Sequence, residues 1–394
     1  MVRAVRNILV MQSGGCTQVI NETLASLVIR SKINFPNSVI YGCRYGADGL
    51  LGSNMVDLGE IPQGAWQLIR ETPGAALGSS RTKLVAANEP VILNVLKTYG
   101  IGLVFLIGGN DSAETARHIG QICKDGGVQV SVLLIPKTID NDLPITDHSP
   151  GYGSAGRFLS IATMGAGQDA LAMGSAAPLS VIEVMGRDTG WLAYASALGK
   201  RSDADPPHVI CIPEEPVPET KFLHLMQTAY SNFGYAVAVV AENCRGYNGP
   251  LGSSENPWLV DGFGHEYYES PAKYLSSLLA THLSVRVRHE HPGAIQRSFQ
   301  AGFSTTDRNE AALVATAASD MAKEGASDGM VTLIRTSNDP YECGTGFVEI
   351  GQIANQVRRL PDEFINSDTL LPTPGFMSYA QPLIGDPLPV YLRI

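Results

Sequence analysis

The amino-acid sequence predicts an α/β protein with two doubly wound, Rossmann-like domains and mainly parallel sheets. Three observations lead to this prediction. The chain has 394 residues, which is more than one simple hydrophobic core usually organises. Short runs of Val, Ile and Leu read as strands that are covered on both faces. These runs alternate with longer amphipathic segments, and that order is typical of βαβ units.

The predicted elements follow one another along the chain in this alternating order. The strand candidates are residues 7–12, 38–45, 102–107, 128–135, 179–185, 208–212, 236–241 and 330–335. The helix candidates between them are residues 21–30, 90–99, 111–124, 191–199, 221–233, 272–283 and 306–324. Two stretches stand apart. Residues 246–267 predict a long surface loop, and the Pro-rich tail from residue 361 predicts a strap across a domain, because it keeps Phe364 and Phe376.

Composition excludes several classes of function. The formal net charge is −10 at pH 7, so non-specific nucleic-acid binding, which needs clustered basic charge, is not expected. Hydrophobic residues make up 44% of the chain, which excludes disorder for most of it. No apolar run approaches the roughly 20 residues that span a bilayer, so no membrane partner is expected. The 6 scattered cysteines form no C-x-x-C pair and favour a reducing, cytoplasmic location.

Glycine-containing loops follow two of the predicted strands. The first is Gln12-Ser13-Gly14-Gly15, placed between a strand and a helix. Glycines there let backbone N–H groups approach a phosphate, although a plain tight turn explains them equally well. The second is the segment 106–112, Leu-Ile-Gly-Gly-Asn-Asp-Ser. Its Asp and Ser either serve a bound anion or simply cap the following helix.

A third loop, residues 136–142 (Pro-Lys-Thr-Ile-Asp-Asn-Asp), carries the strongest chemical signal. It places two carboxylates and an ammonium group directly after an apolar strand. Phosphoryl transfer requires this mixture: a base for the acceptor hydroxyl, a carboxylate for Mg²⁺ and a cation for the phosphoryl oxygens. The alternative is a hydrated Asp-Asn-Asp turn.

Five short motifs follow one another along the chain: Ser-Gly-Gly at 13–15, Gly-Ser-Ser-Arg at 78–81, Gly-Gly-Asn-Asp-Ser at 108–112, Pro-Lys-Thr-Ile-Asp-Asn-Asp at 136–142 and Met-Gly-Arg at 185–187. Together, and in this order, they resemble the motifs of the phosphofructokinase family. The tail is similar to the pyrophosphate-dependent branch. The resemblance implies the phosphofructokinase fold. It further implies a phosphoryl-donor domain of residues 1–151 plus about 296–350, and a sugar-phosphate domain of about 152–295 plus 351–394.

The resemblance also implies roles for residues near the donor. Asp140 matches the base that deprotonates the 1-hydroxyl of fructose 6-phosphate. Asp142 matches a carboxylate associated with Mg²⁺, and Thr138 matches a hydroxyl that contacts substrate. Gly15 matches the donor-phosphate loop, and Arg81 matches a cation that faces the transferred group.

A second group of matches concerns the sugar phosphate. Its members are Met185, Gly186, Arg187, Glu242, Arg288 and Arg297. Arg187 matches an arginine that also steadies the transition state, and Glu242 matches a sugar-binding glutamate. Arg288 and Arg297 match arginines that hold the 6-phosphate. In bacterial relatives the counterpart of Arg288 comes from a neighbouring subunit, so the resemblance implies a homodimer or homotetramer.

Two positions, Asp111 and Lys137, indicate which donor is used. Relatives that use ATP carry Gly at both. A carboxylate at Asp111 would occupy the space of a nucleotide's α-phosphate and repel its charge, whereas Lys137 supplies the point charge that a small anionic donor needs. Asn110 stands where most relatives carry an Asp associated with Mg²⁺. The expected Mg²⁺ ligands are therefore Asn110, Asp111 and Asp142.

The sequence therefore predicts Mg²⁺-dependent transfer of a phosphoryl group from pyrophosphate to the 1-hydroxyl of fructose 6-phosphate. The products are fructose 1,6-bisphosphate and phosphate, in a reversible, cytoplasmic reaction of glycolysis. The expected partners are these small molecules. Two alternatives stay open: an ATP-dependent 6-phosphofructokinase, and a non-catalytic regulatory subunit with the same fold.

Overall fold

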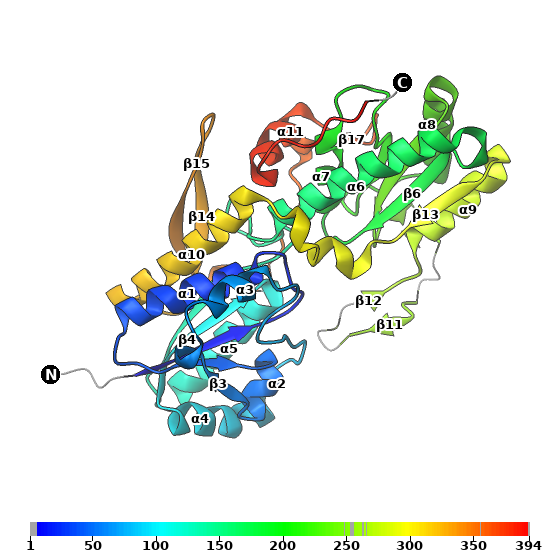
Figure 1. Ribbon diagram of the computed structural model, residues 1–394. Coiled ribbons are helices and arrows are strands. Elements are labelled where there is room, and N and C mark those ends of the chain that lie inside the picture. The colour runs from blue at the N-terminus through cyan, green and yellow to red at the C-terminus, as the bar shows by residue number, and fades with distance from the viewer. Residues whose placement is uncertain are drawn as a thin grey trace. The chain divides into compact units, whose positions relative to one another are not determined.

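Two units, each with its own mainly parallel sheet, make up the chain (Figure 1). The computed structural model describes residues 6–247, 249–252, 256–261, 264, 266–354 and 356–392. Unit 1 comprises Met1–Gly151, Asp261–Phe263 and Asp307–Val357. Unit 2 comprises Tyr152–Val260, Gly264–Thr306 and Arg358–Ile394. The chain thus returns to unit 1 at Asp307, later than the boundary expected near residue 296.

Unit 1 is built on a seven-stranded sheet with the strand order β15-β14-β5-β4-β1-β2-β3. Its strands are β1 Asn7–Gln12, β2 Ile40–Cys43, β3 Met55–Asp57, β4 Ile101–Gly108, β5 Ser131–Pro136, β14 Gly329–Asn338 and β15 Tyr341–Glu349. The five central strands run parallel, and β3 and β15 pair antiparallel at the two edges. This arrangement confirms the predicted fold class for unit 1.

Helices cover both faces of the unit 1 sheet, and β1 shows how the sequence directs them. Ile8 and Val10 join an apolar cluster with the first set of helices, whereas Leu9 and Met11 join a second cluster on the opposite face. The first set is α1 Ile20–Asn34, α3 Ala65–Glu71 and α10 Thr305–Glu324. The second set is α2 Gly46–Leu51, α4 Glu89–Thr98 and α5 Asn110–Asp125.

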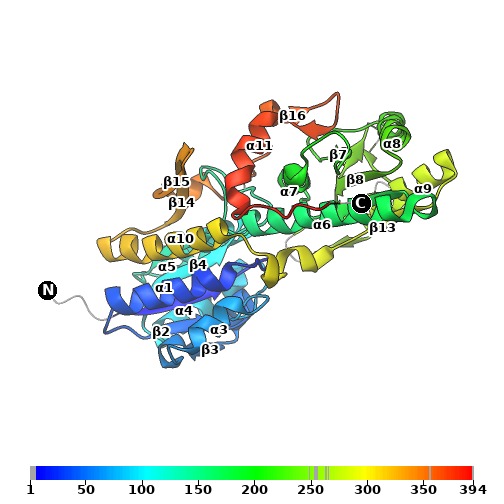
Figure 2. The same cartoon turned by 45° about the horizontal axis from the view of Figure 1, so that its top comes forward.

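Within the first set, α1 and α10 lie side by side, as Figures 1 and 2 show. Arg30 on α1 and Asp320 on α10 form an ion pair with 2.6 Å between Nε and Oδ1. Two segments that are almost 300 residues apart in the sequence therefore cover the same face of one sheet.

Unit 2 contains a four-stranded parallel sheet with the order β13-β6-β8-β7. Its strands are β6 Leu179–Val184, β7 Val209–Cys211, β8 Ala236–Ala241 and β13 Val287–Glu290. Its helices are α6 Tyr152–Met173, α7 Trp191–Ala195, α8 Glu219–Phe233, α9 Pro271–Leu283 and α11 Pro374–Ala380. Right-handed crossovers place α7 on one face, and α8 and α9 on the other. Unit 2 is therefore doubly wound, as predicted.

The Pro-rich tail packs into unit 2, which confirms the predicted strap. Phe376 is fully buried, and its ring lies 6.3 Å from that of Trp191, centroid to centroid. Phe364 adds an edge-to-face contact at 6.0 Å to Trp191. Such ring pairs stabilise a fold beyond the area that they bury.

The predicted loop at 246–267 contains two short hairpins instead of irregular chain alone. They pair β9 Arg245–Gly246 with β10 Gly249–Pro250, and β11 Leu259–Val260 with β12 Glu266–Tyr267. Residues 248, 253–255, 262–263 and 265 of that prediction lie outside the described residues. In the part of the chain that the structure describes, no helix combines the length and the apolar character needed to cross a bilayer.

Candidate active site

In unit 1 the predicted donor residues lie where two neighbouring strands diverge. Strand β1 connects through α1 to β2 on one side, whereas β4 connects through α5 to β5 on the other. Ligands of doubly wound sheets bind at such a switch point, outside the carboxyl ends of the strands. Gly15 follows β1, Asn110 and Asp111 follow β4, and Lys137 follows β5. The topology thus brings the three glycine and carboxylate loops to one edge of the sheet.

Lys137 links two of these loops. Its side chain is only 3% exposed, and its Nζ donates to the carbonyl oxygen of Gly15 over 2.6 Å. Its backbone N–H donates to the carbonyl of Gly108 over 3.1 Å. Gly14 has a φ of +75°, and a Cβ atom on it would lie 3.4 Å from Nζ. A nearly desolvated ammonium group beside a glycine loop is well suited to an anion.

The loop that carries Arg81 is fastened to the same glycines. The N–H of Gly14 donates to the carbonyl of Ser80 over 3.3 Å, and the Ser79 hydroxyl donates to the carbonyl of Gly14 over 2.6 Å. Arg81 itself forms an ion pair with Asp261, with 2.6 Å between Nη1 and Oδ2. The Arg81 side chain is 40% exposed, so its ion pair with Asp261 is weak. The guanidinium group can therefore exchange Asp261 for another anion.

The turn with Asp140 and Asp142 is shaped by the residue between them. Asn141 is fully buried and has a φ of 55°, a left-handed conformation that Asn tolerates better than most residues. Its Oδ1 accepts from the N–H of Ser149 over 3.1 Å. The N–H of Asp140 donates to Oγ1 of Thr138 over 3.1 Å. Thr138 and Asn141 therefore hold the backbone of the turn. The sequence offered an Asp-Asn-Asp turn here as an alternative, but not the burial of Asn141 or its bond to Ser149.

The predicted metal ligands supply oxygen atoms. Nδ2 of Asn110 donates to Oδ2 of Asp142 over 2.6 Å. Its Oδ1 is buried and has no hydrogen-bond partner within the described residues. Asp111 lies in the first turn of α5. Over the same described ranges, no group of three or more His, Cys, Asp or Glu is arranged to hold a metal. The set fits Mg²⁺, which is commonly held by one or two carboxylates plus substrate phosphates.

Unit 2 repeats the arrangement at its own switch point, between β6 and β8. Met185, Gly186 and Arg187 follow β6, and Glu242 follows β8, where its N–H donates to the carbonyl of Val184 over 3.0 Å. Gly186 has a φ of +119°, and a Cβ atom on it would lie 2.6 Å from a backbone oxygen. Only glycine fits there, and the chain then turns sharply into Arg187.

Gln296 was missed as a positioning residue of this loop. It is 1% exposed, and its Oε1 accepts from the N–H of Met185 over 3.1 Å. Arg297, the next residue, ends the short 3₁₀ helix Gly293–Arg297. The contact joins the predicted sugar loop to the predicted 6-phosphate arginine. Sequence spacing does not reveal it, because the two residues are 111 positions apart.

Two guanidinium groups of unit 2 contain buried N–H groups without a hydrogen-bond acceptor within the described residues. Nε and Nη1 of Arg187 and Nε of Arg297 are buried without a hydrogen-bond partner among the residues that the structure describes. Arg187 lies over the ring of Tyr267, 5.5 Å from its centroid. Burial raises the pKa of Glu242, and the charge of Arg187 opposes that rise in part. Since buried, unsatisfied N–H groups are costly, these positions suit a bound anion.

Arg288 is directed toward its own chain. It lies on β13, and its Nη1 pairs with the carboxylate of Asp169 on α6. Both side chains are partly exposed. The expected contact across a subunit boundary stays a prediction.

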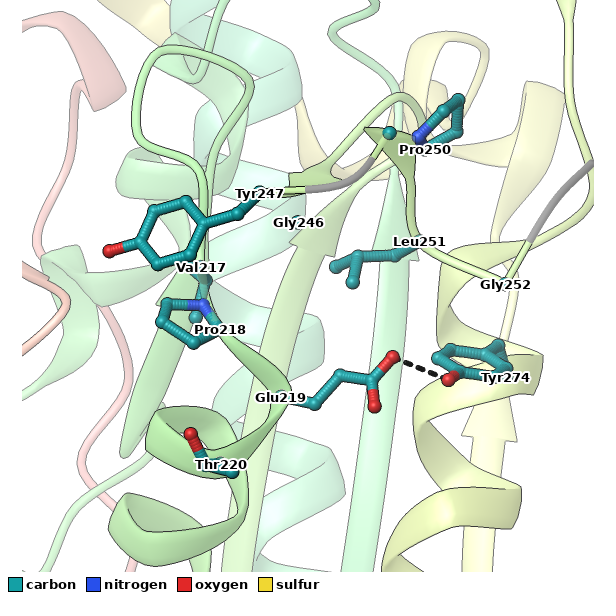
Figure 3. Close-up of a pocket in the computed structure, with 11 residues that line it drawn as sticks. Val217, Pro218, Glu219, Thr220, Gly246, Tyr247, Pro250, Leu251, Gly252 and Tyr274 are labelled. Carbon is teal, nitrogen blue, oxygen red and sulfur yellow. Dashed lines mark hydrogen bonds between the residues drawn. The ribbon is translucent and has the colours of Figure 1, made fainter. Parts of the chain in front are cut away.

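A separate pocket of unit 2 lies at the start of α8 (Figure 3). In it, the Tyr274 hydroxyl donates to Glu219 over 2.5 Å, and Tyr247, Pro218 and Pro250 form its walls. None of its lining residues belongs to the predicted site.

Residues 7–322 match the profile of a family described as "Phosphofructokinase". The chain belongs to the phosphofructokinase family. This finding confirms the resemblance seen in the sequence. It also accounts for the glycine loops and carboxylates of unit 1 and, separately, for the buried arginines of unit 2.

Among phosphofructokinases, this chain is similar to pyrophosphate-dependent members. It is 33% identical to a pyrophosphate–fructose 6-phosphate 1-phosphotransferase of Rhodospirillum rubrum, over 98% of this chain and 96% of the relative. It is 32% identical to the protein of the same name from Methylococcus capsulatus, over 98% and 94%. The crystal structure of a pyrophosphate-dependent phosphofructokinase from Nitrosospira multiformis superposes with a TM-score of 0.89 at 31% identity, covering 99% of this chain and 94% of that one.

Proposed function

We propose that this phosphofructokinase transfers a phosphoryl group from pyrophosphate to the 1-hydroxyl of fructose 6-phosphate. The observation that carries the proposal is the buried ammonium group of Lys137 against the Gly15 loop, with the Asp111 carboxylate at the start of α5. The cation suits a compact, highly charged donor, and the carboxylate disfavours a nucleotide. The names of the relatives from Rhodospirillum rubrum and Methylococcus capsulatus support the same donor and acceptor.

In the proposed reaction Asp140 takes the proton of the 1-hydroxyl. The hydroxyl oxygen forms a bond to the nearer phosphorus of pyrophosphate, the bridging P–O bond breaks, and phosphate leaves. Lys137, Arg81 and Arg187 offset the negative charge on the phosphoryl oxygens, and Thr138 contacts the substrate. Positioning and electrostatics supply most of the acceleration.

The sugar phosphate is assigned to unit 2. Met185 and Gly186 shape the loop, Glu242 binds sugar hydroxyls, and Arg288 and Arg297 hold the 6-phosphate. Arginine presents a fork of N–H groups that matches phosphate oxygens. The buried Nε of Arg297 is one such group.

Mg²⁺ is the proposed cofactor. Asn110, Asp111 and Asp142 would hold it together with pyrophosphate oxygens, and the ion would neutralise charge on the donor. The unsatisfied Oδ1 of Asn110, beside Asp142, supports this set.

The remaining parts of the proposal concern the reversibility of the reaction, its location and the oligomeric state of the protein. The reaction is reversible, because the phosphoanhydride of pyrophosphate lies not far above the sugar phosphoester in transfer potential, and it belongs to glycolysis. We place it in the cytoplasm, which the six free cysteines support. The active form is a homodimer or homotetramer in which Arg288 serves a neighbouring subunit. A non-catalytic role is disfavoured by the buried, unsatisfied N–H groups of Arg187 and Arg297, which cost stability when no ligand binds.

The test measures fructose 1,6-bisphosphate formation by the purified protein with pyrophosphate or ATP as donor. Pyrophosphate should support turnover and ATP should not. Asp140→Asn should bind both substrates and lose kcat by ~10²–10⁴. The matched control is Asp125→Asn at the exposed end of α5, where Gln121 donates to the carboxylate over 2.8 Å. A wild-type protein that prefers ATP, or full turnover in Asp140→Asn, would refute the proposal.

A further inference from the structure

A buried histidine lies a few residues beyond the Asp140–Asp142 turn. The side chain of His148 is 1% exposed. Its Nδ1 lies 2.7 Å from Oδ1 of Asp147, and its Nε2 lies 2.6 Å from Oε2 of Glu310 on α10. Ionised carboxylates only accept hydrogen bonds, so both ring nitrogens must donate. With both carboxylates ionised, this geometry fits a protonated, positively charged imidazolium.

Charged and polar side chains from two further strands complete the cluster. Arg335 on β14 donates to the same oxygen of Asp147, over 2.9 Å from Nη2 and 3.1 Å from Nε. The Tyr341 hydroxyl on β15 donates to Oε1 of Glu310 over 2.5 Å. Two cations thus balance two carboxylates in a cluster that is largely buried, with Asp147 partly exposed. Such a network is favourable while it is complete and costly once one partner is lost.

The ionisation behaviour of the cluster agrees with this geometry. Burial would lower the pKa of His148, but the charge of Glu310 and the hydrogen bonds that the ring donates to both carboxylates outweigh burial and raise the pKa to about 9. Burial favours a higher pKa for Asp147, yet His148 and Arg335 together hold this pKa below its usual value. Burial and Glu310 raise the pKa of Tyr341, and raise that of the nearby Cys343 to about 12. As the pH rises above neutrality, His148 therefore loses its proton before Tyr341 and Cys343 do.

The segment that contains His148 also holds the turn. The N–H of Ser149 donates to Asn141 over 3.1 Å, and the N–H of Thr138 donates to the carbonyl of Pro150 over 3.2 Å. The N–H of Gly151 donates to Oδ1 of Asp307 on α10 over 2.7 Å. Residues 146–151 thus connect the turn on one side to α10 and β14 on the other.

We propose that His148 is a positioning residue for phosphoryl transfer. Its imidazolium fastens residues 146–151 to α10 and β14, and these residues fix the turn that presents Asp140 and Asp142. The inference rests on the proposed function, in which Asp140 is the base. It implies that the charge on His148, and not only the volume of its side chain, keeps Asp140 in the position required for proton transfer.

The variant His148→Gln tests this role, because glutamine keeps hydrogen-bonding groups and removes the charge. At pH 7.5 its kcat should fall ~10–100-fold, as expected for a displaced catalytic group, while the KM for fructose 6-phosphate stays unchanged. The sign of the pH effect follows from the raised pKa. In the wild type, the contribution of the charged His148 to kcat is fully present below pH ~6.5 and is lost as the pH rises through about 9. The fall in wild-type kcat through pH 9 should be absent in His148→Gln.

Two control variants separate positioning from stability. His282→Gln removes an exposed histidine of α9 whose Nε2 lies 3.4 Å from Oε1 of Gln227, and should leave kcat and its pH profile unchanged. Leu96→Ala opens a cavity in the core beneath α4 and should lower Tm without lowering kcat at 25 °C. If His148→Gln keeps wild-type kcat, or if Leu96→Ala at an equal loss of Tm loses as much kcat, the inference is overturned.

Hydrogen exchange on the wild-type protein gives a second test that needs neither a folded variant nor turnover. Amides of residues 138–142 should lose protection between pH 7.5 and 9.5, after correction for intrinsic exchange, while those of β4 keep it. Equal protection of the turn at both pH values would overturn the inference. A wild-type protein without pyrophosphate-dependent turnover would refute the proposed function alone, because exchange does not depend on catalysis.

Discussion

Replacing Lys137 with methionine tests the role of the buried cation most directly. Methionine keeps an unbranched apolar stem of similar length and removes only the charge and the donor. The side chain is 3% exposed and its Nζ lies 2.6 Å from the Gly15 carbonyl, so the change leaves this carbonyl without its donor. An unsatisfied carbonyl of this kind costs ~1–3 kcal/mol of unfolding free energy.

The expected effect on catalysis is larger than the effect on stability. Two unit charges about 4 Å apart interact by ~4 kcal/mol at an effective dielectric constant of about 20. Since ~1.4 kcal/mol corresponds to a tenfold change in rate, the loss of this interaction can lower the rate by at most about 10³-fold. Loss of one donor from a charge-stabilising site typically costs ~10²–10³ in kcat. We therefore expect Lys137→Met to lower kcat/KM for pyrophosphate by ~10²–10³.

The assay follows fructose 1,6-bisphosphate formation over a series of pyrophosphate concentrations at saturating fructose 6-phosphate. The KM for fructose 6-phosphate should be unchanged, because the arginines assigned to its 6-phosphate belong to unit 2. Lys97→Met, at an exposed position of α4, is the matched control and should behave as wild type. A folded Lys137→Met protein that keeps kcat/KM for pyrophosphate within about threefold of wild type would show that Nζ does not face the donor.

Three further predictions follow from other residues. Asp111→Gly should give measurable turnover with ATP, because it removes a carboxylate from the first turn of α5; a folded, pyrophosphate-active variant without ATP turnover contradicts the exclusion argument. Asn110→Asp should raise the KM for pyrophosphate through like-charge repulsion, and a Mg²⁺ titration that matches wild type would place residue 110 outside the metal site. Phe376→Ala should lower the unfolding free energy by ~3–5 kcal/mol in urea, because the ring is fully buried; a loss below ~1 kcal/mol would mean that the tail is dispensable.

The central strands could be predicted closely from the sequence. The predicted ranges 7–12 and 236–241 coincide with β1 and β8, because both strands are buried on two faces and read as unbroken apolar runs. The edge strands β13 and β15 were missed, since polar and glycine residues interrupt their pattern. An exposed edge imposes no apolar periodicity, so its sequence carries less information.

The longest helix, α6, was also missed, because its glycines resemble loop composition. Two of them serve close packing instead. A Cβ atom on Gly156 would lie 3.1 Å from Ala195, and one on Gly167 would lie 2.5 Å from Pro206. The local cost of glycine in a helix is outweighed by contacts with distant segments, which the local pattern does not show.

The candidate site divides in the same way. Its position at the carboxyl ends of strands followed from the alternation of elements and from short motifs such as 136–142. The supporting residues did not follow. His148 meets Glu310 across 162 residues of sequence, and Gln296 meets Met185 across 111. Such pairs exist only once the chain has folded, so no local spacing predicts them.

The discontinuous path of the chain has a consequence for its synthesis. Unit 1 begins with Met1–Gly151 but takes α10, β14 and β15 from Asp307–Val357. The first part leaves the ribosome more than 150 residues ahead of the part that covers it. At about 5–20 residues per second, the apolar surface awaiting α10 stays exposed for roughly ten to thirty seconds. Unit 2 in turn packs Phe364 and Phe376 against Trp191, so the core of unit 2 cannot be completed before these two residues have been synthesised.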